Sequence, residues 1–460
     1  MNNLLKNVLK EIKPGSKELE KERKIEREII KKIQSMKGKH VKVVLAGSVA
    51  RNTHLKNDRD LDFFVMFPTN LSRKDFEKEG LRIAKKVLKG YAWEEVYSEH
   101  PYIKANYKSF DIEIVPTYQI KDTSKLMSAV DRTPFHNEYL KEKLTEKQKD
   151  EIRLLKKFLK NLQAYGADIK ANSFSGYLTE ILILNYGSFE KVLKNASEWK
   201  KQTIIDLSEK WLEVNAKVKF DSPLIVIDPT DYQRNVAAAV STQQFSRFIG
   251  CARAFLKKPG KKFFFGQKTK PWPLRKASVL LKEKDLIFLC FPYPKLVEDL
   301  VWGQIRRLRR KISNQLSLND FKVLNGSEFI QDKKQIIILI ELESHYLNKV
   351  VKHFGPEVTD KKNSEIYLQA HKKPVNGPRV EGSKWVIEKL RTNNNSFDLV
   401  KNYLKDFNKQ PDKNPELTKA LKKNYKLLDS KQVLLEYKKN KEFQNFLTTY
   451  LKGKEEFLDY

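Results

Sequence analysis

The chain has 460 residues, 40% of them hydrophobic, which is enough for roughly two to four globular domains. Its 90 basic against 58 acidic residues give a formal net charge of +32, which indicates a polyanionic partner, most simply nucleic acid. Two cysteines argue against a disulfide framework or a structural zinc site, and no apolar stretch reaches the length of a membrane span. We therefore expect a soluble protein of the reducing cytoplasm, with no membrane partner.

The first part of the chain alternates helix-like and strand-like segments. Apolar residues at helical spacing cover residues 1–38, which end at a glycine. Strand-like segments follow at residues 41–46, 60–67 and 110–116, with a helix-like segment at 75–90. This alternation predicts an α/β or α+β sheet domain over residues 1–145.

The rest of the chain divides into three further regions. Helical periodicity at residues 146–162 and 174–196 predicts a mainly helical central domain, residues 146–250. Strands at 261–266, 285–294 and 334–344, with a basic helix at 301–316, predict a mixed α+β domain, residues 251–380. Residues 376–385 read as a turn-rich junction, and short lysine-rich helices follow over residues 381–460. Residues 251–460 hold 44 basic and 24 acidic residues, so we expect this part to bind the polyanion most strongly.

A nucleotide triphosphate site is predicted within LAGSVARNTHLKNDRDLDFFVMF, residues 45–67. Gly47 and Ser48 follow a strand and precede a segment that can open a helix, a geometry that binds phosphate, and Arg51 can fork onto an anionic oxygen. Asp60 and Asp62 share one face of a strand, where their oxygens suit Mg²⁺. Neither a Walker lysine motif nor a protein-kinase signature accompanies these residues.

A second acidic pair lies on the segment FDIEIVP. Asp111 and Glu113 are again two residues apart, so they share one face of their strand. Three carboxylates from neighbouring strands can hold two metal ions that activate a hydroxyl and carry a triphosphate. An exposed strand edge with alternating acids is the structural alternative.

The motifs resemble a known superfamily. GSVARNTHL with DLDFFVMF resembles the signature of the nucleotidyltransferases that include DNA polymerase β. The downstream segments SAVDRTPFHNEYL, FSGYL, YGSFEKVLKNASEWK and VIDPTDYQRNVAAAVS closely resemble the archaeal, class I CCA-adding enzymes. The resemblance covers the whole chain in order and is strongest over residues 45–241. It implies an α+β multidomain protein with a polymerase β-like palm, a helical central domain and mixed α/β RNA-binding C-terminal domains.

The resemblance implies template-independent addition of C, C and A to the 3′ end of tRNA from CTP and ATP, with two Mg²⁺ ions and release of pyrophosphate. The basic C-terminal domains would grip the acceptor end and T-stem by shape. The helix with Arg306, Arg307, Arg309 and Arg310 is a candidate contact, with a plain solvated face as the alternative. The oligomeric state stays open, and a homodimer is one option.

The resemblance also implies a role for each residue of this chain that occupies a functional position in the family's motifs. The triphosphate would be held by Gly47, Ser48, Arg51, Lys156 and Tyr165, the metals by Asp60, Asp62 and Glu113, and the nucleotide pocket would include Thr133, His136 and the base-reading Arg234. The family often has Glu-x-Asp at the first pair and Asp at the third acid. This chain has Asp60-x-Asp62 and Glu113, so Asp111 stays an alternative third carboxylate.

Simpler interpretations compete with these roles. His136 could be a hydrogen-bonded structural histidine, Lys156 a solvated lysine, Tyr165 a packing residue, and Arg234 a local partner of Asp231. A polyadenylating polymerase on the same catalytic core is the alternative enzyme, and the nucleotides incorporated distinguish the two. An inactive RNA-binding relative is the alternative of another class, and the intact set of acids argues against it.

Overall fold

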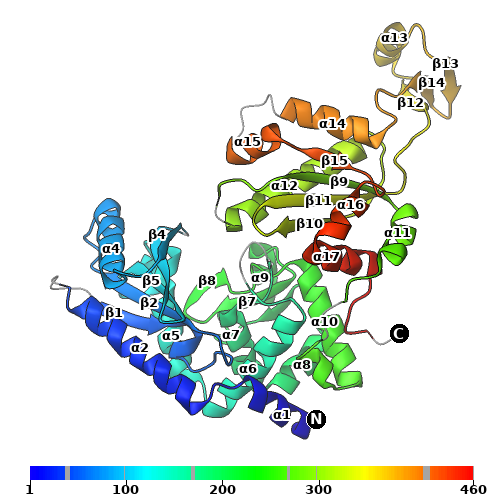
Figure 1. Ribbon diagram of the computed structural model, residues 1–460. Helices are drawn as coiled ribbons and strands as arrows, with labels where there is room; N and C mark the ends of the chain where they lie inside the picture. The colour runs from blue at the N-terminus through cyan, green and yellow to red at the C-terminus, as the bar shows by residue number, and fades with distance from the viewer. Residues whose placement is uncertain are drawn as a thin grey trace. The chain divides into compact units, whose positions relative to one another are not determined.

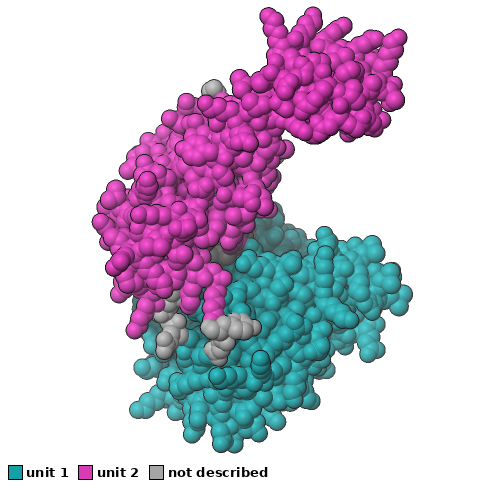
Figure 2. Space-filling view, turned by 90° about the vertical axis from the view of Figure 1, so that its right-hand side faces the viewer, with its two compact units in different colours: residues 1–267, 455–460 teal, residues 268–454 magenta. Residues whose placement is uncertain are grey.

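The computed structural model describes residues 1–36, 42–97, 99–166, 171–266, 270–296, 298–407 and 415–458. The chain forms two compact units, one of residues 1–267 with 455–460 and one of residues 268–454, coloured separately in Figure 2. Within these described ranges, no helix is long and apolar enough to cross a membrane. Gly38, the predicted helix end, lies outside the described residues.

A five-stranded sheet forms the N-terminal part of the first unit (Figure 1). Its order is β1-β2-β5-β4-β3, with β1 Lys42–Ala46, β2 Asp60–Phe67, β3 Trp93–Tyr97, β4 Pro101–Tyr107 and β5 Phe110–Tyr118. Strands β2 and β5 are parallel, and the other neighbours are antiparallel. The strands predicted at 41–46, 60–67 and 110–116 are confirmed, whereas β3 and β4 were not predicted.

One face of this sheet is apolar and covered by helices. Leu61, Phe63 and Val65 of β2 are buried with side chains of α2 (Ser16–Gln34) and α4 (Arg73–Val87). Because side chains alternate along a strand, this burial leaves the residues between them on the opposite face. Asp60 and Asp62 are therefore placed on the face away from the main apolar core of this sheet.

The rest of the first unit is mainly helical. Its elements are α1 Asn2–Ile12, α3 Gly47–Ala50, α5 Thr133–Lys143, α6 Glu146–Asn161, α7 Gly176–Tyr186, α8 Phe189–Ser197, α9 Glu213–Lys219 and α10 Thr242–Lys257, with 3₁₀ turns η1 Thr123–Lys125 and η2 Ala129–Arg132. A small sheet of order β6-β7-β8 is inserted, with β6 Thr203–Ile205, β7 Leu224–Asp228 and β8 Asp231–Asn235. The helices predicted at 146–162 and 174–196 are confirmed. Helix α10 runs through residue 250, where the sequence placed a domain boundary.

The strand predicted at residues 261–266 is wrong. Residues Lys261–Phe263 form a 3₁₀ turn, η3, and the rings of Phe263 and Phe264 pack around Phe158 and Phe255. The run of aromatic residues therefore fills the core of the helical part instead of pairing in a sheet.

A second sheet organises the other unit, with the order β10-β11-β9-β15. The strands are β9 Asp285–Pro292, β10 Val323–Gln331, β11 Gln335–Leu342 and β15 Lys426–Leu428. One face packs on α12 Glu298–Leu318, α14 Ser396–Phe407 and α15 Pro415–Lys423, and the other on α11 Leu274–Lys282, α16 Val433–Lys439 and α17 Lys441–Lys452 (Figure 1). The strands predicted at 285–294 and 334–344 and the helix at 301–316 are confirmed.

The turn-rich junction predicted at residues 376–385 is wrong. These residues belong to the hairpin of β13 Asn376–Glu381 and β14 Lys384–Leu390, which pairs with β12 Val350–Glu357 beside α13 Lys361–Ala370. Gly382, at φ +59°, lies between the two strands of the hairpin. The division placed at residue 380 falls inside this hairpin, and the lysine-rich helices after it return to the sheet of β9.

Candidate functional site

Two pairs of acids stand side by side on β2 and β5. The parallel register sets Asp60 level with Asp111 and Asp62 level with Glu113. Burial, reinforced by Glu113 and then Asp60, raises the pKa of Asp62 to about 7, and burial also raises the pKa of Asp60. Since like charges on one face oppose ionisation, a bound cation would favour the ionised form of both aspartates.

The acids of β5 each contact a polar side chain of β4. Lys104 Nζ lies 3.0 Å from Glu113 Oε1, and Asn106 Nδ2 lies 3.0 Å from Asp111 Oδ1. Across the part of the chain that the structure describes, no three histidine, cysteine or acidic side chains are arranged to hold a metal ion. The oxygen donors and raised pKa values of Asp60 and Asp62 nevertheless fit a hard divalent cation.

Gly47 brings the chain directly against Asp62. Its φ of +76° is unfavourable for a residue with a side chain, and a Cβ built at this position would lie 2.2 Å from Asp62 Oδ2. The predicted helix opening is the single turn α3, which carries Ser48. The backbone of this turn therefore lies beside the carboxylate of Asp62.

Arg51 and Lys156 converge on a buried acid, Glu180 of α7. Arg51 NH2 lies 2.7 Å from Glu180 Oε2, and Lys156 Nζ lies 3.7 Å from Glu180 Oε1 and 3.2 Å from Thr53 Oγ1. Arg51 NH1 also donates to Asn137 Oδ1 at 3.2 Å. Lys156 is only 1% exposed, so it is not the solvated lysine of the simpler interpretation.

The pKa values within this cluster reflect burial and charge. Burial lowers the pKa of the Lys156 ammonium to about 8, although Glu180 opposes the change. Burial alone would raise the pKa of Glu180, but Arg51 and Lys156 hold it below its ordinary value. Glu180 is therefore ionised between the two cations.

Tyr165 lies between α6 and α7, and its hydroxyl reaches Gly176, the first residue of α7. A Cβ at Gly176 would lie 2.9 Å from its hydroxyl, and Lys160 Nζ lies 5.4 Å from the centre of its ring. Burial raises the pKa of Tyr165, so its hydroxyl keeps its proton and can donate. This placement allows both packing and a contact with a ligand.

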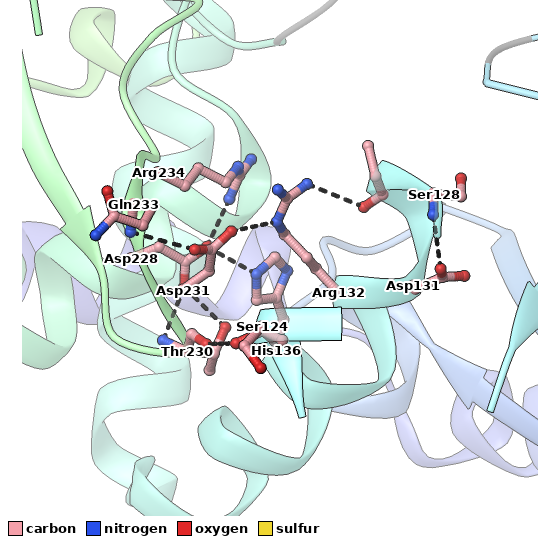
Figure 3. Close-up of polar contacts among 12 residues, drawn as sticks. Ser124, Ser128, Asp131, Arg132, His136, Asp228, Thr230, Asp231, Gln233 and Arg234 are labelled. Atoms are coloured by element: carbon pink, nitrogen blue, oxygen red, sulfur yellow. Dashed lines mark hydrogen bonds and ion pairs between the residues drawn. The ribbon is translucent and has the colours of Figure 1, made fainter. Parts of the chain in front are cut away.

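His136 and Arg234 meet at Asp228 (Figure 3). His136 Nε2 lies 2.8 Å and Arg234 NH1 2.7 Å from Asp228 Oδ2, while Tyr177 donates to Oδ1 at 3.1 Å. Burial alone would raise the pKa of Asp228, but His136 and Arg234 hold it low, and burial lowers the pKa of His136. A neutral His136 therefore donates to an ionised Asp228.

Arg132 pairs with Asp231, the aspartate that the simpler interpretation of the sequence assigns to Arg234. Arg132 Nε lies 2.6 Å from Asp231 Oδ2, and Arg234 pairs with Asp228 and not with the Asp231 of the simpler interpretation. Thr133 follows Arg132 and begins α5. Figure 3 shows one dashed line from Arg132 to Asp231 and another from Arg234 to Asp228.

A cavity of about 660 Å³ adjoins this cluster. Its lining includes Arg132 from η2, Ser175 from the start of α7, and Arg234 from β8, together with Lys219. The carboxylates of β2 and β5 are not among its lining residues. The cavity thus lies on the Arg132 and Arg234 side of the site.

The residues of this site that were not predicted from the sequence include Glu180, Asp228, Asp131 and Asn137. The sequence does contain a signal that could have identified Glu180, because this residue is the single acid in the apolar segment GYLTEILIL. Asp228 and Asp131 lie inside the motifs that carry the resemblance, and Asp131 accepts hydrogen bonds from Thr117 Oγ1 and from three backbone N–H groups. Asn137 lies in the same motif as Asp131, but its residue type alone does not mark it as a site residue.

The arginines of α12 differ in their environments. Arg307 and Arg310 are exposed, whereas Arg309 Nε lies 2.6 Å from Glu328 Oε1 on β10. The Arg306 guanidinium lies 5.8 Å from the centre of the Trp302 ring. The four side chains therefore do not form one uniform basic face.

Comparison with known families assigns most of the chain. Residues 26–136 match the nucleotidyltransferase domain family, residues 150–265 the tRNA nucleotidyltransferase second domain, and residues 283–430 the CCA-adding enzyme C-terminal domain. A solved structure of the Cid1 poly(U) polymerase aligns with a TM-score of 0.46 and 14% identity, over 57% of this chain and 95% of that one.

Three archaeal relatives are similar over most of their length. The CCA-adding enzyme of Methanocaldococcus jannaschii is 38% identical over 81% of this chain and 85% of its own. Those of Methanosarcina mazei and Pyrobaculum islandicum are 35% and 34% identical and cover 86% and 88% of this chain, and 88% and 94% of their own. With these identities and this coverage, the chain belongs to the CCA-adding enzyme family of nucleotidyltransferases.

Proposed function

We propose that this chain adds C, C and A to the 3′ end of tRNA from CTP and ATP without a template and releases pyrophosphate. Family membership supports the reaction, and one structural observation supports its location: Asp62 stands level with Glu113 on β5 and against the backbone of Gly47. Acids and a phosphate-binding turn at one point are what nucleotidyl transfer requires.

Asp60, Asp62 and Glu113 would hold two Mg²⁺ ions. Glu113 is favoured over Asp111 because it is level with Asp62 and is the acid that most raises the pKa of Asp62 after burial. Ions bound there would lower the pKa of the attacking hydroxyl and stabilise the pyrophosphate that leaves. Lys104 would then have to share Glu113 with a metal ion.

The protein's own residues would position the reacting groups. The terminal 3′-hydroxyl oxygen of tRNA would form a bond to the α-phosphorus, its proton would pass to a carboxylate of the site or to solvent, and the bond to pyrophosphate would break. The turn of Gly47 and Ser48 would hold the triphosphate, with Arg51, Lys156 and Tyr165 on the side of the helices. The positive charges of Arg51 and Lys156 would partly neutralise the leaving pyrophosphate.

The base would occupy the cavity beside Arg132 and Arg234. This assignment rests on the lining of the cavity and on Asp228, which fixes the direction of the Arg234 guanidinium. Thr133 and His136 would complete the pocket at the start of α5. A guanidinium held in one direction can select between bases by the acceptors on their edges.

The basic second unit would grip the tRNA acceptor end and T-stem in the cytoplasm. Arg307 and Arg310 are the candidates on α12, because their side chains are exposed and Arg309 is paired with Glu328. Side chains cannot read the deep groove of A-form RNA, so recognition would depend on shape and phosphates. Residues 1–145 would form the catalytic palm, and the helical part that follows, with α10 continuing past residue 250 to Lys257, would complete the nucleotide pocket.

Primer extension tests this proposal against polyadenylation. The substrates are tRNA ending before the first C, after one C and after two, each given one of the four nucleotides. We expect C at the first two positions and A at the third. Long poly(A) products formed without CTP would instead support a polyadenylating polymerase.

A further inference from the structure

Glu180 is a fully buried acid whose cationic partners are two residues proposed to bind the triphosphate. It lies on α7 among buried apolar residues, and its side chain has no exposed surface. Arg51 contacts one carboxylate oxygen, while Thr53 Oγ1 and Lys156 lie at the other. The acid thus reaches the site from the helical part of the first unit.

Charge balance explains why an acid is needed at this place. Arg51 and Lys156 are 7% and 1% exposed, and two buried cations side by side would repel each other and lose their hydration. Glu180 compensates one of the two charges. A net positive charge remains, which suits an anionic ligand.

Several charged groups act on Lys156 besides Glu180. Arg51 after α3 and Lys160 on α6 disfavour its protonated form, and Asp58 before β2 favours it. Glu180 has the largest charge effect of the four, and burial is the main opposing factor. Lys156 is therefore the member of the cluster whose charge depends most on Glu180.

We propose that Glu180 is a positioning residue for nucleotide binding, which directs Arg51 and Lys156 toward the triphosphate and keeps Lys156 protonated at neutral pH. This inference rests on the proposed role of Lys156 at the triphosphate. Glu180 itself would touch neither the nucleotide nor the metal ions.

The test is the pH dependence of the KM for CTP in the Glu180→Gln variant, with tRNA ending before the first C. Glutamine keeps the size of the side chain and can still accept a hydrogen bond from Arg51. In the wild type the KM should rise above the Lys156 pKa of about 8. Loss of an acid this close should move that rise at least about one pH unit lower and raise the KM at least about fivefold at pH 8. The change in kcat should be smaller.

Two further variants separate charge from structure. Glu180→Gln with Lys156→Arg should lose the new pH dependence, because arginine stays charged at every pH used. Glu180→Asp keeps the charge but is shorter, so it should keep the wild-type pH profile with a KM raised severalfold at all pH values. If Glu180→Gln does not fold, the Glu180→Asp variant still tests whether Glu180 positions Arg51 and Lys156. The matched control is Glu146→Gln on α6, an exposed acid paired with Lys149, which should behave as wild type.

Different results would overturn different statements. If Lys156→Ala leaves the KM for CTP unchanged, the proposed triphosphate role of Lys156 is wrong. If Lys156→Ala raises the KM but Glu180→Gln keeps the wild-type pH profile, the role of Glu180 is wrong. A wild-type KM in Glu180→Asp would remove the positioning role.

Discussion

The backbone of Gly47 lies against the carboxylate of Asp62, with no room for a side chain between them. A Cβ at position 47 would lie 2.2 Å from Asp62 Oδ2, and the φ of Gly47 is +76°. Both features restrict the position to glycine. The contact joins the turn proposed to bind phosphate to the acid proposed to bind metal, so a small change here should affect the chemistry more than the fold.

Gly47→Ala should therefore abolish most of the nucleotide addition. The new methyl group must displace Asp62, and a displacement of this kind should lower kcat/KM by at least about a hundredfold. Gly90→Ala is the matched control, because Gly90 has φ +90° and nothing within 4 Å of a Cβ. The control should lose about 1 kcal/mol of stability and keep its activity. Equal activity losses in the two variants would show that backbone strain alone is responsible.

Asp62→Asn should abolish activity and stabilise the metal-free protein at neutral and alkaline pH. The Asp62 pKa of about 7 lies above its ordinary value, so its contribution to stability is present at low pH and is lost as pH rises through 7. Asparagine removes that penalty, which amounts to roughly 1–4 kcal/mol above pH 7. The measurement is the thermal unfolding midpoint at pH 5 and 8 with a chelator present. Binding to tRNA should be nearly unchanged, and full turnover with Mg²⁺ would refute the metal role.

The shared strand face of Asp60 and Asp62 could be predicted, because the alternation of side chains along a strand depends only on residues close together in the sequence. Asp60 and Asp62 lie two residues apart in an apolar strand, so their shared face follows from the sequence. The partners of Arg51 could not be predicted in this way. Glu180 lies 129 residues further along the chain, and only the packing of α7 brings it to the arginine.

Two wrong predictions of the fold have the same cause. The run KKFFFG has the aromatic content of a strand, but the core around Phe158 also needs aromatic rings, and tertiary packing decides between them. NGPRVEGSKW has the glycine and proline content of a loop, yet its backbone pairs on both sides of Gly382. The residue content of a segment alone does not show whether another strand pairs with it.

Arg234→Ala should relax the choice of nucleotide more than it slows addition of a correct one. Asp228 directs the guanidinium, whose donors can match acceptors on C or A, whereas U or G would leave buried groups unpaired at about 1–3 kcal/mol each. The measurement is kcat/KM for all four nucleotides on the three tRNA substrates. Arg247→Ala is the matched control, because Arg247 pairs with Glu455 away from the cavity. Unchanged selectivity in Arg234→Ala would remove this residue from base recognition.

Removal of the exposed arginines of α12 should reduce the salt dependence of tRNA binding. With a net charge of +32, affinity should fall steeply between low and moderate salt, since each neutralised phosphate releases counterions. In Arg307→Ala/Arg310→Ala, the slope of log affinity against log salt should become shallower by roughly 1.5–2, if each arginine meets one phosphate. Filter binding or fluorescence anisotropy over a range of salt concentrations measures the slope.

Arg309→Ala is the control on the same helix. Arg309 pairs with Glu328, so its loss should destabilise the packing of α12 on β10 and lower the unfolding midpoint, while the salt slope stays close to that of the wild type. An unchanged slope in Arg307→Ala/Arg310→Ala would place the phosphate contacts on other basic residues of the chain. A reduced slope in both variants would mean that Arg309 exchanges Glu328 for a phosphate when tRNA binds, because only a residue that neutralises a phosphate can change the number of counterions released.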